Sequence, residues 1–218
     1  MKHSTRLIIL HYTKIGEKSL VLHCLTPEWG RRSFVCTVGR SSSMALVLPL
    51  NILDAEITEN SKSDLWRAGA LSSAFSLNNI RTNPYKNAIS MFMSEVLFRA
   101  VRDGACEQGL YEWCEKSILT LEELPSDCSN YHLRWLLELC GAMGFTPSQE
   151  DIAPFAEDNF ASIRELLRLP FAQSLLLPLS GRERNAIAES ILRYLSHHLE
   201  SGINVRSLAV LGELFRNN

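Results

Sequence analysis

The stretch from Gly16 to Arg40 decides the fold and reads GEKSLVLHCLTPEWGRRSFVCTVGR. Side chains at 19–25 and at 32–38 alternate between two faces, which predicts two β-strands. The polar turn Thr26–Gly30 joins them. Both faces of the first strand are largely apolar, as expected in a small closed barrel with additional cover.

Three further strands are expected on either side of this hairpin. Thr5–Tyr12 is an apolar, β-branched run, Pro49 interrupts the apolar segment before a strand near Asn51–Thr58, and Leu65–Ala74 is a weaker fifth strand. Five short strands separated by polar turns fit an OB-fold barrel. Strand number alone leaves an SH3-like barrel open.

The hydrophobic period changes to that of a helix after Pro84, which suits a first helical turn, and Gly104 ends this segment. Five more helices are predicted: Glu107–Thr120, Asn130–Met143, Phe160–Leu169, Glu183–Leu199 and Val205–Phe215. Ser129 is the expected N-cap of the helix that follows it. The prediction is an α+β chain with an OB-fold β-barrel at 1–78 and an all-α helical domain at 79–218.

The net charge of −2 hides an uneven distribution. Residues 1–50 carry a balance of +5, residues 51–103 a balance of zero, and residues 104–218 a balance of −7. A basic N-terminal part on an acidic remainder indicates a local contact with a polyanion. Chance unevenness in a soluble protein is the alternative.

Composition limits the cellular setting. The chain of 218 residues is 46% hydrophobic, which is enough for a substantial core, and it has no apolar run long enough to span a membrane. The segment MKHSTRLIILHYTK is interpreted as a strand and not as a signal peptide. The six cysteines form no CxxC pair, which favours reduced thiols in a cytoplasmic protein.

Catalytic motifs are missing from the sequence. It contains no GxGxxG, GxxxxGK[ST], HExxH or GxSxG pattern. The pair Glu122-Glu123 precedes Pro125, where a solvated turn is expected. The histidines in strands or late in a helix are interpreted as packing, rim or surface residues: His11, His23, His197 and His198. The chain is therefore not expected to be an enzyme, and no metal ligands are predicted.

Cations and one aromatic residue of the N-terminal part are the candidate DNA-binding residues. They are Lys14, Lys18, Trp29, Arg31, Arg32 and Arg40. Lysine and arginine neutralise backbone phosphates without reading sequence, and a tryptophan beside them can stack on an unpaired base. Two alternatives stay open, namely that Trp29 folds onto the barrel and that the arginines serve only solubility.

At these residues the chain resembles the RecO family of bacterial recombination mediators. The resemblance rests on Gly16–Leu20, on Thr26, Glu28 and Gly30-Arg31, on Gly39-Arg40 and on the Leu48-Pro49-Leu50 step. In the helical half it includes Leu133–Leu139, Gly144–Pro147 and the ending LRYLSHHLESGINVRSLAVLGEL at 192–214. The match is most similar to the form of the family in Bacteroidetes.

The resemblance implies a non-enzymatic mediator of recombinational DNA repair. Such a protein binds single- and double-stranded DNA, anneals strands and helps to load RecA onto DNA covered by single-stranded DNA-binding protein (SSB). Its partners would be RecR, the SSB C-terminal tail and, in some members, RecF and RecA. The tail would meet Arg134 and Trp135, a cation beside apolar residues. The alternative for Arg134 is an ion pair with Glu138, four residues on.

The chain departs from the family pattern after Pro147. Many members carry a four-cysteine zinc module there, whereas Ser148–Ser180 has no cysteine. We therefore expect no zinc, and a helix near Phe160–Leu169 in place of the module. A second hypothesis makes the chain a protein–protein adaptor that works through its helical domain without binding DNA.

Overall fold

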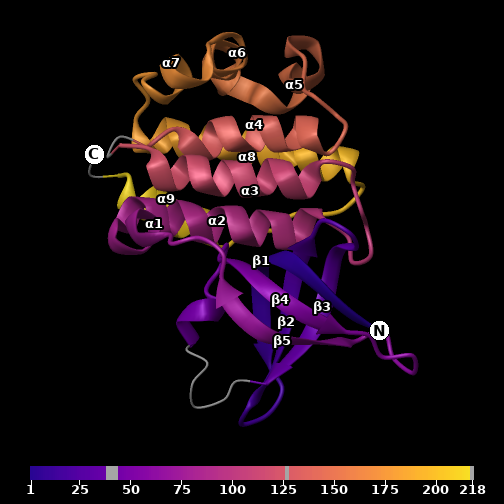
Figure 1. Ribbon diagram of the computed structural model, residues 1–218. Helices are drawn as coiled ribbons and strands as arrows, with labels where there is room; N and C mark the ends of the chain where they lie inside the picture. Colours follow the sequence, from indigo (N-terminus) through magenta and orange to yellow (C-terminus); the bar gives the residue numbers. More distant parts are fainter. Residues whose placement is uncertain (38–43, 126–127, 217–218) are drawn as a thin grey trace. The chain divides into compact units, whose positions relative to one another are not determined.

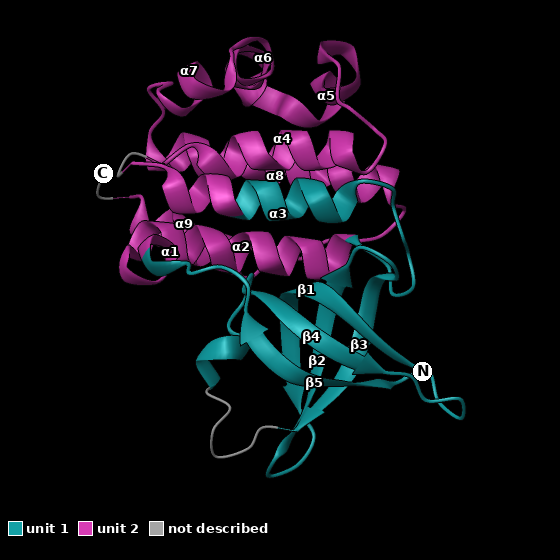
Figure 2. Ribbon diagram, in the orientation of Figure 1, with its two compact units in different colours: residues 1–78, 101–118 teal, residues 79–100, 119–218 magenta. Residues whose placement is uncertain are grey.

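The computed structural model describes residues 1–37, 44–125 and 128–216. The chain forms two compact units (Figure 2). Unit 1 comprises 1–78 and 101–118, and unit 2 comprises 79–100 and 119–218. The segment 101–118 thus returns to the unit that holds the strands.

Unit 1 contains a closed five-stranded barrel in the order β1-β2-β3-β5-β4 (Figure 1). The strands are β1 (Lys2–Lys14), β2 (Ser19–Thr26), β3 (Gly30–Thr37), β4 (Ile52–Thr58) and β5 (Trp66–Ser73). Strands β3 and β5 pair in parallel and every other pair is antiparallel. The predicted OB-fold barrel and the predicted α+β class are confirmed, and β1 begins three residues earlier than expected.

Alternation along the strands fills the barrel. Leu20, Leu22 and Cys24 of β2 and Phe34 of β3 are buried inside it. Leu20, Leu22 and Cys24 share a face, as the alternation predicts, and the structure shows that this face is the inner one. The long strand β1 serves two partners, because its first half pairs with β4 and its second half with β2. A register shift between Ile9 and His11 marks the change.

The step before β4 is a short 3-10 helix, η1 (Met44–Val47), followed by a turn. Leu50 has φ 60° there, and its amide donates to Ile9 O at 2.7 Å. The Asn51 side chain donates to the carbonyls of Ala45 and Leu46 at 2.7 and 3.0 Å. Residues 44–51 are thereby fastened to the barrel although Pro49 ends any regular pairing.

Nine α-helices and one further 3-10 helix occur in the part of the chain that the structure describes. They are α1 (Asn78–Thr82), α2 (Pro84–Ala100), α3 (Leu110–Glu123), α4 (Tyr131–Ala142), α5 (Gln149–Ala156), η2 (Glu157–Asn159), α6 (Phe160–Arg168), α7 (Phe171–Leu175), α8 (Gly181–His198) and α9 (Ser207–Leu214). The six predicted helices correspond to α2, α3, α4, α6, α8 and α9, with ends shifted by a few residues. Helices α1, α5 and α7 were not predicted.

Helix ends show one wrong prediction and two missed signals. The N-cap of α4 is Asn130 and not Ser129. Asn130 makes no side-chain cap, because its amide donates to the carbonyls of residues 174, 175 and 177 instead. Ser148 and Ser180 begin α5 and α8 with capping boxes to Asp151 and Glu183.

The expectation that Glu122 is solvated is also wrong. Its side chain is buried, and its carboxylate accepts hydrogen bonds from the amides of Asn79 and Ile80, both at 2.8 Å. A carboxylate there satisfies two amides at the start of α1. Lys86, also buried, donates to Glu122 O at 2.8 Å and to Leu124 O. Together these contacts join α1, α2 and the end of α3 within unit 2.

Candidate nucleic-acid interface

The β1–β2 turn carries two of the predicted cations. Lys14 ends β1 and Lys18 precedes β2, and both side chains are exposed. Ile15 N donates to Ser19 O at 3.1 Å and closes the turn, while the Ile15 side chain stays 54% exposed. Among the described residues neither ammonium forms a salt bridge. This turn therefore presents two positive charges to solvent.

Arg31 at the start of β3 is built into unit 1. Its backbone exchanges hydrogen bonds with residues 104 and 105, and Nη1 donates to Val101 O. Burial lowers the pKa of the guanidinium, and the charge of Asp103 opposes that shift. The neighbouring Gly30 has φ +58°, and a Cβ there would lie 1.9 Å from Ala105 O. Only glycine allows the 101–105 segment to approach this closely.

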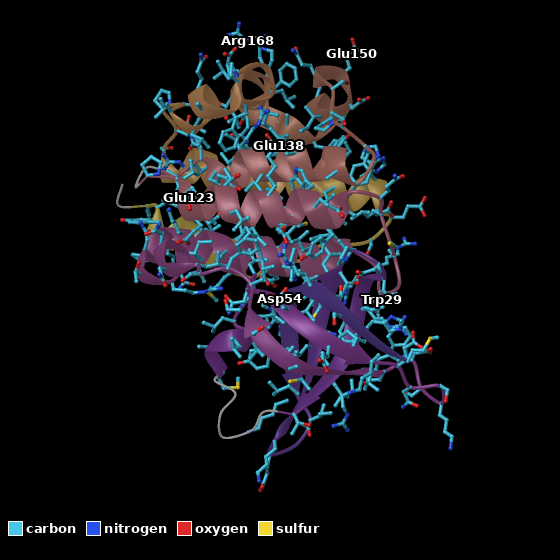
Figure 3. The ribbon with its side chains drawn as sticks, in the orientation of Figure 1. Trp29, Asp54, Glu123, Glu138, Glu150 and Arg168 are labelled. Atoms are coloured by element: carbon cyan, nitrogen blue, oxygen red, sulfur yellow. The ribbon has the colours of Figure 1, made fainter. Side chains whose placement is uncertain are left out.

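Arg32 points away from Arg31 and stacks on an aromatic residue. Its guanidinium carbon lies 3.5 Å from the centroid of the Trp66 ring, and Nη2 donates to Asp64 O at 3.3 Å. Trp29 lies beside the first residues of β3 (Figure 3). Its ring meets Trp66 edge-on at 5.4 Å and Phe34 at 6.4 Å. The half-buried Trp29 packs against the barrel core, which is the alternative that the sequence left open.

The predicted cations fall into two groups along β2 and β3. Lys14 pairs with Leu20 on β2, whereas Arg32 pairs with Cys24. These positions of β2 are four residues apart, which is about 13 Å along a strand. The structure brings Lys14 together with Lys18, and Trp29 together with Arg32, but it does not gather all of them in one cluster. Arg40 lies outside the described residues.

Between these two groups, the outer face of β1, β2 and β3 carries side-chain contacts that were not predicted from the sequence. His11 of β1 pairs with His23 of β2, and their rings stack 5.9 Å apart at 15°. His23 Nδ1 lies 2.8 Å from Ser33 Oγ on β3, and Nε2 lies 3.3 Å from Thr13 Oγ1. Alternation had placed His23 on the face opposite Leu22, but only the register shows what it meets.

A further arginine was missed on β5. Arg67 is exposed, opposite Val35 of β3 and Thr58 of β4. It therefore belongs to the outer surface of the barrel. The sequence could have indicated this. Side chains alternate along a strand, so if Trp66 faces the core, the next residue, Arg67, faces outward.

Arg134 and Trp135 in unit 2 have intramolecular roles. Arg134 Nε donates to Glu138 Oε1 at 2.7 Å, and Nη1 donates to the carbonyls of Leu166 and Leu169 at 2.8 and 3.2 Å. The ion pair that the sequence offered as an alternative is thus present, and the same guanidinium caps the end of α6. Trp135 is only 2% exposed and meets Phe92 edge-on at 6.5 Å.

Two properties of the described residues bear on other classes of site. No group of three or more His, Cys, Asp or Glu side chains there is arranged to hold a metal ion. Among the helices that the structure describes, none combines the length and the apolar character needed to cross a membrane. Five cysteines are buried free thiols and Cys106 is an exposed one.

A closed OB barrel with exposed lysines at its β1–β2 turn belongs to a class of proteins that bind oligonucleotides or oligosaccharides. Comparison with known families identifies the particular one. The model for the N-terminal part of recombination protein O matches residues 1–74, and the model for its C-terminal part matches residues 81–153. The chain belongs to the RecO family.

Individual relatives agree along nearly the whole length. A DNA repair protein RecO from Phocaeicola vulgatus is 30% identical, covering 95% of this chain and 97% of its own. The protein of the same name from Bacteroides fragilis is 28% identical over 95% of this chain and 97% of its own. That from Flavobacterium johnsoniae is 26% identical over 99% of this chain and all of its own. The similarity supports a role in DNA repair and recombination.

Proposed function

We propose that this chain is a non-enzymatic DNA-binding recombination mediator. It binds single- and double-stranded DNA, anneals complementary strands and assists the loading of RecA onto SSB-coated single strands. The observation that carries the proposal is the pair of exposed lysines on the turn between β1 and β2 of an OB barrel. In barrels of this class that turn and the face of strands 2 and 3 contact oligonucleotides.

The proposed DNA contacts differ in how far each side chain is already engaged in contacts within the protein. Lys14 and Lys18 contact phosphates directly, since they are exposed and form no salt bridge within the described residues. Trp29, from the turn before β3, and Arg31 and Arg32 of β3 also contribute, with Arg31 adding mainly charge because its Nη1 already binds Val101 O. Arg40, in the segment after β3, completes the set by its charge.

Protein partners belong to the same proposal. RecR, the C-terminal tail of SSB and, in some settings, RecF and RecA would assemble with this chain. The tail would approach Arg134, whose charge suits an acidic peptide. Trp135 would act from below the surface, because it is buried against Phe92.

Binding of labelled DNA at several salt concentrations tests the proposal. A single strand and a duplex of equal length are titrated with protein between 50 and about 200 mM salt and followed by fluorescence anisotropy. Affinity is expected to fall steeply with salt, because phosphate contacts release counterions. Annealing of complementary strands is followed in the same buffers by energy transfer. A chain that retains neither DNA at the lowest salt concentration is not a mediator of this kind.

A second candidate function is that of a protein–protein adaptor without direct DNA binding. A groove of about 690 Å³ between α8 and α9 favours it. Small residues widen this groove, among them Ala186 of α8 and Ala209 and Gly212 of α9, while Arg182 and Glu213 supply charges of both signs. The adaptor predicts no DNA retention in the titration above.

A further inference from the structure

Three aromatic rings follow one another on β1 and β2. Tyr12 and His11 stack at 6.3 Å and 20°, and His11 and His23 stack at 5.9 Å and 15°. His11 is exposed, Tyr12 is 36% exposed and His23 is half-buried. A row of nearly parallel rings at the surface is therefore available between the β1–β2 turn and the start of β3.

The innermost ring of this row is fixed in place. Both nitrogens of His23 have hydroxyl partners, Ser33 Oγ at 2.8 Å and Thr13 Oγ1 at 3.3 Å. A ring held on both sides keeps its plane, so it supports His11 without further ordering. Its environment also favours the neutral form of His23. Burial lowers its pKa, the charges of His11 and Arg31 lower it further, and Asp103 partly opposes them.

The surroundings of the row are cationic and point to one class of ligand. Lys14 continues β1 two residues after Tyr12, and Lys18 lies across the turn. On the other side lie the partly buried Arg31 of β3 and the exposed Arg67 of β5. Flat rings flanked by cations match a nucleic-acid strand whose bases are unpaired, because bases stack on rings while phosphates meet cations. A duplex keeps the faces of its bases stacked inside, so it offers phosphates, sugars and base edges but no base face to the same surface.

We propose that Tyr12, His11 and His23 form a stacking surface for unpaired bases, which makes the barrel prefer single strands to duplexes. This inference rests on the proposed DNA-binding function and gives a role in base stacking to His11 and His23, which were interpreted from the sequence as rim or packing residues. Tyr12 contacts a base with the ring face that does not meet His11, His11 supports Tyr12, and His23 positions His11.

Substitutions at His11 separate stacking from charge. The variants His11→Phe, His11→Lys and the double variant His11→Ala/Tyr12→Ala are compared with the unchanged chain at pH 8. A single strand carrying the fluorescent base 2-aminopurine and a duplex of equal length serve as probes. The double variant is expected to lose roughly tenfold or more in single-strand affinity, since one stacked base contributes about that much. Duplex affinity and the salt slope stay within about twofold of the unchanged chain.

The outcomes distinguish this proposal from the one on which it rests. His11→Phe is expected to keep both the affinity and the change in 2-aminopurine fluorescence, and His11→Lys is expected to lose the fluorescence change. If His11→Lys kept the single-strand affinity of the unchanged chain and His11→Phe lost it, position 11 would contact a phosphate, and the stacking surface would be overturned. Equal losses for single strand and duplex would overturn it as well. If the unchanged chain binds neither probe, the DNA-binding function itself fails. Unchanged midpoints of urea unfolding show that the variants are folded.

Discussion

The guanidinium carbon of Arg32 lies 3.5 Å from the centroid of the Trp66 ring, so a cation of β3 stacks on the first residue of β5. These two strands are the parallel pair of the barrel. A cation–π contact there joins two segments more than 30 residues apart in the chain. Arg32 is therefore part of the barrel as well as a proposed DNA contact, and the two roles separate by substitution.

Arg32→Ala is expected to lower the free energy of unfolding by about 1 kcal/mol, because the stack on Trp66 is lost. Arg32→Lys keeps the charge and loses the planar stack, so its stability is expected to fall while its DNA affinity is retained. Urea unfolding and anisotropy titrations measure the two effects. Arg67→Ala, at the exposed neighbour of Trp66, is the control for removal of an arginine in the unfolding measurements. Equal stability of Arg32→Ala and the unchanged chain would show that the stack contributes nothing.

Gly30→Ala is expected to destabilise the barrel by roughly 2 kcal/mol or more. Gly30 has φ +58°, and the new Cβ would lie 1.9 Å from Ala105 O. Relief requires the 101–105 segment to move away from β3, which breaks the bonds between its backbone and that of Arg31. Chemical denaturation measures the loss. Gly16→Ala is the matched control, since a Cβ at Gly16 meets nothing within 4 Å.

Local pattern was sufficient for most of the fold, because alternation and helical period are properties of neighbouring residues. Leu20, Leu22 and Cys24 share one face of β2 as their spacing predicted, and the structure places that face inside the barrel. What failed depended on distant parts of the chain. Glu122 looked like a solvated residue because the α1 amides that it binds come from a five-residue helix about 40 positions earlier.

In the candidate site, too, the features set by neighbouring residues were predicted and those set by distant residues were not. The sequence identified Lys14 and Lys18 by their place beside a turn, which is local information. Alternation along β3 already places Arg31 and Arg32 on opposite faces, but the sequence could not show that they meet Val101 O and the Trp66 ring. Register between strands and the return of 101–118 to unit 1 decide those contacts, and neither is encoded in a short window of sequence.

Stability in unit 2 is expected to fall in weak acid because of His132. The residue is 1% exposed and its ring stacks on Phe215 at 5.9 Å. Burial, and then the charge of Arg184, lower its pKa from 6.5 to about 3. The unfolded chain takes up a proton below pH 6.5 that the folded chain refuses until about pH 3. Stability from this residue is therefore complete above pH 6.5 and falls as the pH drops from there toward 3.

At pH 5 the loss from His132 is about 2 kcal/mol relative to pH 7.5. Urea unfolding at the two pH values measures it. His132→Phe removes the titrating group, so this variant should lose less stability than the unchanged chain between the same two pH values. The same change at the exposed His197 controls for the added ring. Identical pH dependence in His132→Phe and the unchanged chain would contradict the assignment.

Arg134→Ala is expected to cost about 1.5–3 kcal/mol of stability, because its guanidinium binds Glu138 and the last carbonyls of α6. Arg168→Ala is the control, since Arg168 also pairs with a glutamate of its own helix but is exposed, and little change is expected there. Binding of an acidic peptide to Arg134→Ala must be interpreted together with these unfolding data, because an unfolded variant would also lose binding. Full stability combined with lost binding of an acidic peptide would assign Arg134 to the partner rather than to the fold.

Replacement of both turn lysines, Lys14→Ala/Lys18→Ala, is expected to weaken single-strand and duplex binding alike. Each phosphate contact contributes about 0.7 to the slope of log affinity against log salt for single strands and about 0.9 for duplexes. Loss of two contacts should therefore reduce the slope by about 1.4 and 1.8. Both side chains are exposed, so the unfolding midpoint should not move. Lys62→Ala/Lys116→Ala, with lysines outside the β1–β2 turn, tests whether any loss of two charges suffices. If the slopes of the turn variant match those of the unchanged chain, the phosphates are bound elsewhere on the barrel.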